Sequence, residues 1–434
     1  MPRKRRHTPL RVFINNRPVG LLAREAGGAI EFRYAESWLA RENAFPVSLS
    51  LPLREDAYRG EPVVAVFENL LPDSEALRRR VAEKVGANGF DAYSLLSRIG
   101  RDCVGALQFL PEDESLEETT RIQGEALDDA AIEALLLNLA QTPLGLTRDE
   151  DFRISVAGAQ EKTALLRHEG RWRKPFGTTP TTHLFKTAIG RLPNGIDLSN
   201  SIENEYYCLE LLRAFGLPVN AAEIVEFGAT KALVIERFDR RWTMDGRLLR
   251  LPQEDCCQAL SVPPTRKYQN EGGPGIVDIL NLLKGSDIPA EDQKTFLKAQ
   301  ILFWLIGATD GHAKNFSLFL GPRGRFRLAP LYDVLTAQPS LDSRHILDKQ
   351  MKLAMSVGKS RHYVMRFIKG RHFAQTAEAA GIAPQIATDA LSEVIDSAEE
   401  AFTRVCASLP SDFPSQIPEV VQAAFFARAK AAHE

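Results

Sequence analysis

The hydrophobic pattern of this chain changes near Leu251, and this change constrains the possible fold more than any other feature. Between 150 and 250 the apolar residues form short runs with the length and the β-branched or aromatic content of strands. These runs are "RISVA", "KTALLRH", "THLFKTAI", "AEIVEFG" and "KALVIERF", with one helical stretch, "NEYYCLELLRAFG", inserted among them. We expect an antiparallel sheet that carries one helix.

After Leu251 the apolar residues recur at spacings of three and four, which predicts helices. The helical stretches are "GIVDILNLLKG", "AEDQKTFLKAQILFWLIGAT", "APQIATDALSEVIDSAEEAFTRVCASL" and "PEVVQAAFFARAKAA". Before the sheet, residues from about 9 to 110 alternate strand-like and helical runs. A chain of 434 residues is too long for one ordinary core. We therefore predict an α+β protein with a small N-terminal α+β subdomain (1–110), a strand-rich N-terminal lobe (111–250), an all-helical C-terminal lobe (251–434) and a site in the cleft between the lobes.

Composition excludes several classes of protein. The net charge of −2 provides no overall basic field for binding nucleic acid, so any DNA contact has to be local or supplied by a partner. The one basic cluster, "PRKRRH" at Pro2 to His7, is read as a solvated tail or as a basic arm. No apolar stretch approaches the ~20 residues of a membrane span, so we expect a cytoplasmic protein without membrane contact. The five cysteines have no CxxC spacing, which favours reduced thiols over a zinc site.

The most informative stretch is "FWLIGATDGHAKNFSLFLGPRGRFRLAPLYDV", residues 303 to 334. An apolar helix leads into Asp310, and two alternating apolar runs follow, joined by the turn "GPRGR". Folding this hairpin about Arg323 places Asn315 opposite roughly Leu331. Asp333 then lies beside Asn315 and close to Asp310.

Two carboxylates and a carboxamide that converge in a loop offer the hard oxygen ligands that Mg²⁺ prefers, with nucleotide phosphates completing the shell. Asn315 and Asp333 are the candidate metal ligands, and Asp310 is left as the proton acceptor. The order base, amide and carboxylate is also that of protein-kinase catalytic loops. The alternative interpretation is that these residues serve as turn residues and helix caps.

Four further features point to a nucleotide, and the first three have an ordinary alternative. The loop "AGAQE" in "ISVAGAQEKTALL" (154–166) has small residues that let backbone N–H groups approach phosphates, but it lacks a GxGxxG or GxxxxGK[ST] spacing, and a plain β-turn is the alternative. Lys186 ends "THLFK" and is a candidate for the α/β-phosphates, or is simply an exposed lysine. Glu205, ahead of Glu203 and Glu210, is the expected partner of Lys186, unless these residues form a solvated helix face. Glu236 and Phe238 in "VIERFDRR" end a strand where backbone groups can receive an adenine edge.

Together these stretches resemble one known family. "RISVAGAQEKTALL", "PTTHLFK", "SIENEYYCLELL", "VIERFDRRW", "RLPQEDCCQALSVPPTRKYQNEGGPGI", "TDGHAKNFSLFL" and "LAPLYDV" look like the HipA serine/threonine kinases, toxins of bacterial type II toxin–antitoxin modules. "FENLLPD" and "LLSRIGRDCVGALQF" resemble the first domain of that family. The resemblance covers nearly the whole chain and implies a two-lobed protein-kinase-like (HipA or phosphoinositide-kinase-like) fold.

The resemblance assigns roles to individual positions. Asp310 matches the catalytic aspartate, and Asn315 and Asp333 match the Mg²⁺-binding positions. Ser155 matches an autophosphorylated serine, for which an exposed strand hydroxyl is the alternative. The positions that match nucleotide-binding residues are Ala157, Gly158, Ala159, Gln160, Glu161 and Lys162 in the loop over ATP, Lys186 at the phosphates, Glu236 and Phe238 at the adenine-side hinge, and His312. A phosphoserine carries about −1.5 to −2 charges, so a phosphate on Ser155 is expected to expel the loop from ATP.

The activity implied by the resemblance is ATP- and Mg²⁺-dependent phosphorylation of a protein, with glutamate–tRNA ligase as the expected substrate and growth arrest or persistence as the result. The implied partner is a HipB-type helix-turn-helix antitoxin, which supplies most of the operator DNA contacts in a co-repressor complex. Val334 follows Asp333 where other kinases have Phe-Gly, and His312 follows Asp310, so activation-segment arguments are not carried over.

Two other functions remain open from the residues. One is a catalytically inactive nucleotide-binding co-repressor, against which the joint presence of Asp310, Asn315, Asp333 and Lys186 argues. The other is a metal-dependent phosphohydrolase built on Asp310, His312 and Asp333. A single histidine without a further acidic cluster makes a poor two-metal site, which disfavours it.

Overall fold

The computed structural model describes residues 7–114, 122–146, 154–157 and 160–432, and its contacts divide the chain into two compact units. The first, called the strand-rich unit here, contains residues 1–187, 225–265 and 318–326. The second, called the helical unit, contains residues 188–224, 266–317 and 327–434. In the described part of the chain, no helix combines the length and apolarity that a membrane crossing requires.

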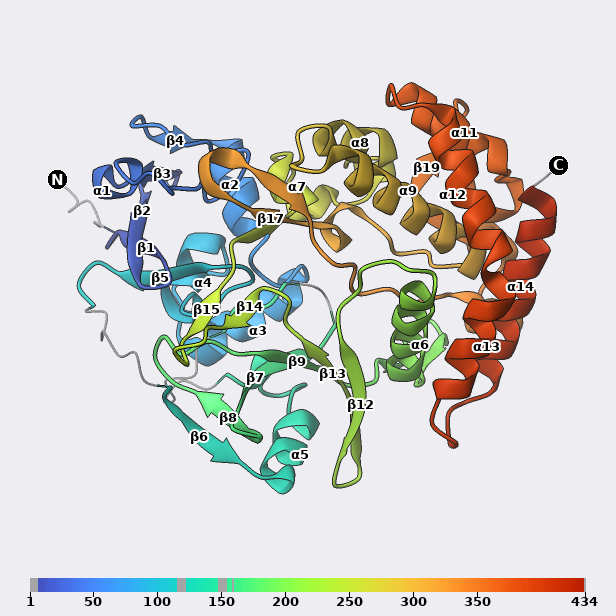
Figure 1. The fold of residues 1–434 in the computed structure, drawn as a ribbon. Helices are drawn as coiled ribbons and strands as arrows, with labels where there is room; N and C mark the ends of the chain where they lie inside the picture. The colour runs from blue at the N-terminus through green and yellow to red at the C-terminus, as the bar shows by residue number, and fades with distance from the viewer. Residues whose placement is uncertain (1–6, 115–121, 147–153, 158–159, 433–434) are drawn as a thin grey trace. The chain divides into compact units, whose positions relative to one another are not determined.

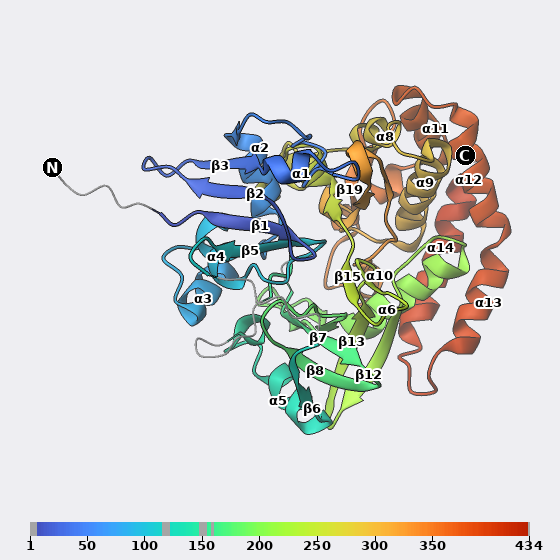
Figure 2. The ribbon, with the colours of Figure 1, turned by 60° about the vertical axis from the view of Figure 1, so that its left-hand side comes forward.

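The N-terminal part of the strand-rich unit is a five-stranded antiparallel sheet with the order β4-β3-β2-β1-β5 (Figures 1 and 2). Helix α2 packs on β3 and helix α4 on β5, and their apolar sides share one core with the sheet. The elements are β1 Leu10–Ile14, β2 Arg17–Arg24, β3 Ile30–Tyr34, α1 Glu36–Leu39, β4 Tyr58–Arg59, α2 Glu61–Glu68, α3 Glu75–Val85, α4 Ala92–Ile99 and β5 Leu107–Pro111.

A six-stranded sheet with the order β12-β13-β9-β7-β8-β6 completes most of this unit. Helix α5 lies against this sheet (Figure 1). Its residues Ile132 and Leu136 join Phe185 and Phe227 in a second core. The elements are β6 Gly124–Leu127, α5 Asp129–Leu137, β7 Lys162–His168, β8 Arg171–Pro175, β9 His183–Lys186, β12 Ala222–Phe227 and β13 Thr230–Glu236. The strands predicted at "KTALLRH", "THLFKTAI", "AEIVEFG" and "KALVIERF" are thus confirmed.

The strand predicted at "RISVA" is wrong for its described residues, because Ile154 forms only an isolated parallel bridge with Asp102. Three short strands and one helix follow β13: β14 Arg240–Trp242, β15 Leu248–Arg250, β16 Gln253–Asp255 and α7 Cys256–Ala259. All five cysteines are free thiols, as predicted, and only Cys406 is exposed.

The helical unit is organised around α9 (Pro289–Ile306), which packs against α12 and α14 (Figure 1). The single helix predicted over 383–409 is two helices that meet at Ser397. The other helices are α6 Ser201–Ala214, α8 Ile276–Leu283, α10 Gln338–Asp342, α11 Gly370–Ala379, α12 Pro384–Asp396, α13 Ala398–Ser408 and α14 Gln416–Ala432. The unit also carries two strand pairs that the sequence did not indicate, β10 Gly190–Arg191 with β11 Asp197–Leu198, and β19 Lys352–Val357 with β20 His362–Val364.

The hairpin predicted about Arg323 is confirmed. Its strands are β17 (Ser317–Leu320) and β18 (Phe326–Leu328), and Arg323 turns between them at φ 59°. The N–H of Ala329 donates to the carbonyl of Ser317 at 2.8 Å. This register places residue 315 opposite residue 331, as the sequence predicted.

Candidate functional site

The loop after α9 presents the first candidate residue. Helix α9 ends at Gly307, whose φ of 78° lies in the left-handed region, and Asp310 follows as an exposed residue. Gly311 allows the loop to lie on the core, because a Cβ there would be 2.5 Å from the ring of Phe303. A single 3₁₀ turn, Ala313–Asn315, then brings the chain into β17.

The side chain of Asn315 joins the three predicted residues. Its Nδ2 donates to the carbonyl of Asp310 at 3.0 Å and to the carbonyl of Asp333 at 3.3 Å. Asp333 has a φ of 58°, in the left-handed region that Asp adopts more readily than most residues other than glycine. The two hydrogen bonds of Asn315 therefore hold the backbone of Asp310 and the backbone of Asp333 together within the helical unit.

Tyr268 is a site residue that the sequence analysis did not single out. Its hydroxyl donates a hydrogen bond to Oδ1 of Asp310, and its ring lies edge-on to the ring of His312 at a centroid distance of 4.9 Å. His312 is buried, and its backbone N–H donates to the carbonyl of Asp310 at 2.8 Å. Tyr268 lies 42 residues before Asp310 in the sequence, so no local spacing could have linked the two.

The donor atoms of the helical unit fit a magnesium ion that is bound together with a nucleotide. Both hydrogen bonds of the Asn315 amide use its nitrogen, which leaves the side-chain oxygen to act as a ligand. Among the residues that the structure describes, no group of three or more His, Cys, Asp or Glu side chains is gathered for a metal. A site with one carboxylate and one amide oxygen suits Mg²⁺, which commonly takes its other ligands from phosphates and water.

Two buried lysines face each other in the strand-rich unit. Lys162 at the start of β7 is the direct cross-strand partner of Lys186 at the end of β9, so both side chains leave the same face of the sheet. They are 6% and 4% exposed, so the alternative of an ordinary exposed lysine is wrong for Lys186. Like charges placed directly opposite are unfavourable. Two ammonium donors on one face of a sheet offer charge-assisted hydrogen bonds to an anion such as a phosphate.

The loop before β7 is fixed at its described ends. Nζ of Lys162 donates to the carbonyl of Ala157 at 2.7 Å, and Nε2 of Gln160 donates to the carbonyl of Thr187 at 2.7 Å. Glu161 forms an ion pair with Arg80 at 3.3 Å. The remaining two predicted loop positions, Gly158 and Ala159, lie outside the described residues, as does all of the basic N-terminal cluster except His7.

Ser155 is completely buried, so its alternative interpretation as an exposed strand hydroxyl is wrong. Its Oγ donates to the carbonyl of Leu70 at 2.8 Å, and its N–H donates to the carbonyl of Asp102 at 2.9 Å. Any reaction at this hydroxyl therefore requires the segment to leave its place in the unit.

The predicted hinge adjoins a buried ion cluster that the sequence analysis missed. Glu236 is exposed at the end of β13, and Phe238 lies edge-on to Phe319 at 5.5 Å. In "RFDRR", Arg241 is exposed, but the other three charged residues are buried. They belong to a cluster in which every member is less than 10% exposed: Asp102, Arg237, Asp239, Arg240 and Arg250.

Helix α6 contains the predicted partner of Lys186. Glu203 and Glu205 are both buried, at 7% and 1% exposure, so a solvated helix face is wrong for these two positions. Glu210 instead pairs with Arg213 on the same helix. Lys186 and Glu205 belong to different units, and their pairing stays a prediction.

Comparisons with known proteins give a consistent result. A family described as the HipA-like C-terminal domain matches residues 154–402, and one described as the HipA N-terminal domain matches residues 10–110. The chain is 36% identical to "Putative kinase Y4mE" of Sinorhizobium fredii over 402 residues, 91% of each chain. It is 28% identical to "Serine/threonine-protein kinase toxin HipA" of Shewanella oneidensis over 336 residues, which cover 74% of this chain and 72% of the relative.

A solved structure shows the same fold. A chain in the Shewanella oneidensis complex of the toxin–antitoxin proteins HipA and HipB with operator DNA superposes with a TM-score of 0.80 and 23% identity. The superposition covers 97% of this chain and 96% of that chain. The two-lobed kinase-like fold predicted from the sequence is therefore confirmed.

Proposed function

Because the chain belongs to the HipA family, we propose that it is an ATP- and Mg²⁺-dependent serine/threonine protein kinase that acts as the toxin of a toxin–antitoxin pair. The observation that carries the proposal is the convergence of Asp310 and Asp333 on the amide of Asn315. These residues stand in the order of a kinase catalytic loop. The relative named as a serine/threonine-protein kinase toxin supports the same class of activity.

In this proposal Asp310 accepts the proton of the substrate hydroxyl. Its exposed carboxylate already accepts one hydroxyl, that of Tyr268, so it has the position and the chemistry to accept another. Asn315 and Asp333 hold Mg²⁺, which neutralises charge on the transferred phosphoryl group when it is bound with ATP. Lys162 and Lys186 bind the phosphates, and the segment of Glu236 and Phe238 receives the adenine.

We further propose that Ser155 is the autophosphorylation site. The buried hydroxyl has to be released before it can react, so autophosphorylation reports a conformational change as well as catalysis. Once phosphorylated, the segment carries about −1.5 to −2 charges beside the loop expected over ATP. Repulsion between the two sets of phosphates makes this modification an off-switch.

For the partner and the substrate, the proposal follows the relatives. The solved structure of similar fold is a complex with HipB and operator DNA, which supports a HipB-type antitoxin as the partner. The net charge of −2 fits DNA contacts made mainly through that partner. Glutamate–tRNA ligase is the proposed protein substrate, and blocked translation with growth arrest is the proposed outcome.

The deciding experiment is intact-protein and peptide mass spectrometry of the wild type, Asp310→Asn and Ser155→Ala after incubation with ATP and Mg²⁺. We expect one phosphate on Ser155 in the wild type and none in Ser155→Ala, which lacks the acceptor hydroxyl. Asp310→Asn should lose the modification as well, because loss of a general base costs about 10²- to 10⁴-fold. Ser155→Ala should still phosphorylate glutamate–tRNA ligase. If the wild type binds ATP but transfers no phosphate to itself or to the ligase, the inactive co-repressor is the better interpretation.

A further inference from the structure

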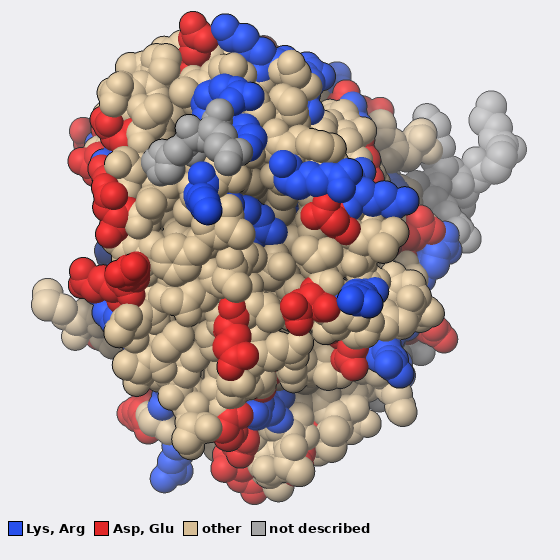
Figure 3. Space-filling view, turned by 90° about the vertical axis from the view of Figure 1, so that its right-hand side faces the viewer, with Lys and Arg blue, Asp and Glu red and all other residues tan. Residues whose placement is uncertain are grey.

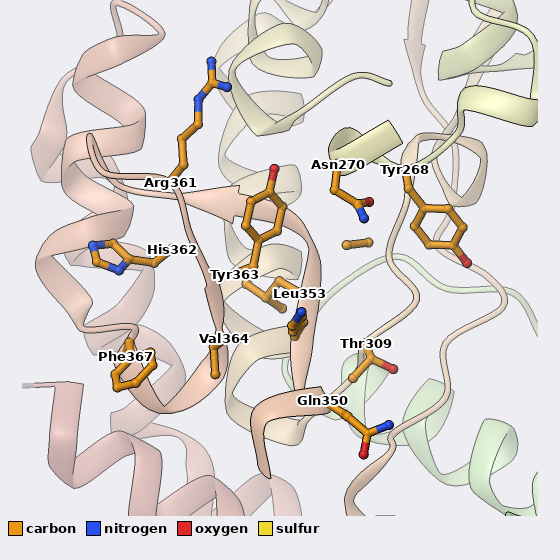
Figure 4. Close-up of a pocket in the computed structure, with 12 residues that line it drawn as sticks. Tyr268, Asn270, Thr309, Gln350, Leu353, Arg361, His362, Tyr363, Val364 and Phe367 are labelled. Atoms are coloured by element: carbon orange, nitrogen blue, oxygen red, sulfur yellow. The ribbon is translucent and has the colours of Figure 1, made fainter. Parts of the chain in front are cut away.

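A pocket of about 510 Å³ opens beside Asp310 within the helical unit. Thr309, the residue before Asp310, lines it, and so does Tyr268, whose hydroxyl binds the Asp310 carboxylate. Figure 4 shows Tyr363 and Leu353 of the β19–β20 pair on one side, with Asn270 and Tyr268 opposite them. The volume lies within the range of ~300–1,000 Å³ that is typical of ligand sites.

The walls of this pocket are cationic. Lys352 and Arg361 line it, and none of its lining residues is acidic. Both side chains are exposed, and neither forms an ion pair or a side-chain hydrogen bond within the described part of the chain. By contrast, Lys359 pairs with Glu378 at 3.0 Å, and Arg366 pairs with Asp348 at 2.8 Å. Lys352 and Arg361 are therefore available to an incoming anion.

The surrounding sequence strengthens this charge. Residues 344–371 contain eight Lys or Arg residues and one acidic residue, in a chain whose net charge is −2. Figure 3 shows Lys and Arg side chains gathered in the upper part of one face, at the height of α11 in Figure 1. A local field of this kind attracts acidic segments and raises their rate of association.

The neutral groups of the pocket suit a polypeptide. The side-chain amide of Asn270 can donate to and accept from a peptide backbone, and Thr309 adds a hydroxyl (Figure 4). The Gln350 side-chain oxygen accepts from the N–H of Leu347 at 2.7 Å, and its NH₂ group can donate to a peptide carbonyl. Tyr363 and Leu353 supply an apolar surface for side-chain packing. A nucleic acid depends on many phosphate contacts for its affinity, and two lining cations are few for that purpose.

We propose that this pocket docks an acidic segment of the protein substrate and thereby brings a nearby serine or threonine hydroxyl to Asp310. The inference rests on the proposed kinase function and specifies its substrate class: polypeptides with Asp or Glu residues beside the phosphorylated position. Lys352 and Arg361 bind the carboxylates, and Asn270 and Gln350 bind the backbone.

The test uses two fluorescein-labelled serine peptides that differ only in having Glu or Gln beside the serine. Fluorescence anisotropy with the full-length protein, without nucleotide, measures binding. We expect the Glu peptide to bind about tenfold more tightly than the Gln peptide, which corresponds to ~1.4 kcal/mol. The double variant Lys352→Ala, Arg361→Asn should lose this preference. Asn is chosen at 361 because the φ of 53° there is tolerated better by Asn than by Ala.

A matched control removes two charges outside the pocket. Lys359→Ala with Lys430→Ala changes the charge of the helical unit by the same amount and should keep the preference, since neither residue lines the pocket. Lys352→Glu should reject the Glu peptide and bind a Lys-flanked peptide instead, which would show that the variant protein is folded. Equal binding of the Glu and Gln peptides by the wild type would overturn the proposal.

Phosphorylation assays on the same peptides separate this inference from the proposed function. If the Glu peptide binds through Lys352 and Arg361 but no peptide is phosphorylated with ATP and Mg²⁺, docking stands and the kinase proposal fails. If both peptides are phosphorylated with equal kcat/KM, the kinase proposal stands and docking fails. Transfer RNA is added as a competitor, and its tighter binding through the same two cations would reassign the pocket to nucleic acid.

Discussion

Replacing Asp102 with Asn should strongly destabilise the strand-rich unit. Oδ1 of Asp102 accepts from Nη2 of Arg240 and from Nε of Arg250, both at 2.9 Å, and Arg237 lies 3.4 Å from Oδ2. Burial alone would raise the pKa of Asp102, but the three guanidinium groups hold it well below its usual range. Asp102 is therefore ionised, and its negative charge is needed by its neighbours.

The size of the effect follows from what remains after the substitution. Asn preserves the shape but leaves three buried guanidinium groups with Asp239 as the remaining acid of the cluster. Breaking one buried ion pair by removing a partner costs about 3–5 kcal/mol, because a charge is left without compensation. For a unit of this size, 1 kcal/mol corresponds to roughly 2–4 °C in Tm. We expect Tm to fall by about 6–20 °C.

The assay is urea and thermal unfolding of full-length protein, followed by tryptophan fluorescence. Trp38, Trp172 and Trp242 report on the strand-rich unit and Trp304 on the helical unit. Asp245→Asn is the matched control, since this exposed carboxylate pairs with Arg247 at 2.8 Å and its loss should barely move the midpoint. If Asp102→Asn shifts the midpoint no more than Asp245→Asn does, the ion cluster does not stabilise the fold.

Three other substitutions test the pH dependence of stability, the binding of the acceptor peptide and the binding of the nucleotide. Burial raises the pKa of Glu254 to about 8, so the folded state holds this proton more tightly, and stability should fall by up to ~1.4 kcal/mol per pH unit as the pH rises from about 5 to 8. Glu254→Gln should flatten that slope in urea titrations, and an unchanged slope would contradict the assignment. Tyr268→Phe should change KM for the acceptor peptide while leaving KM for ATP within about twofold, because its hydroxyl contacts Asp310. Lys186→Met should weaken nucleotide binding by about tenfold or more in calorimetry, equivalent to ~1.4 kcal/mol, and equal affinity would exclude Lys186 from the phosphate site.

The part of the site that could be predicted from the sequence is the part that depends on local register. Asp310, Asn315 and Asp333 lie within 24 residues of one another on a helix end and a hairpin. Alternating apolar runs and a Gly-rich turn fix the pairing of such a hairpin, and the pairing fixes which residues meet. The hydrogen bonds from Asn315 to the other two residues are the result.

The parts that were missed depend on contacts between distant segments. Tyr268 reaches Asp310 from another loop, and Asp102 meets Arg240 across 138 residues. In the sequence, "RFDRR" has the appearance of a solvated charged run, because nothing local reveals the buried carboxylate that compensates it. Lys352 and Arg361 join the pocket only because β19 and β20 pair, and the sequence analysis did not predict those strands.

The burial of Ser155 indicates that the proposed off-switch works by keeping the phosphorylated segment out of its buried position. A hydroxyl fits the site because it has a single acceptor, the carbonyl of Leu70. A phosphate there would bring about −1.5 to −2 charges against a carbonyl oxygen inside the protein, and burying such charges without partners costs several kcal/mol or more. The phosphorylated segment therefore cannot return to the place it occupies in this structure. Autophosphorylation would hold the segment out until a phosphatase removes the group, and limited proteolysis near Ser155 should cut the phosphorylated protein faster than the unmodified protein.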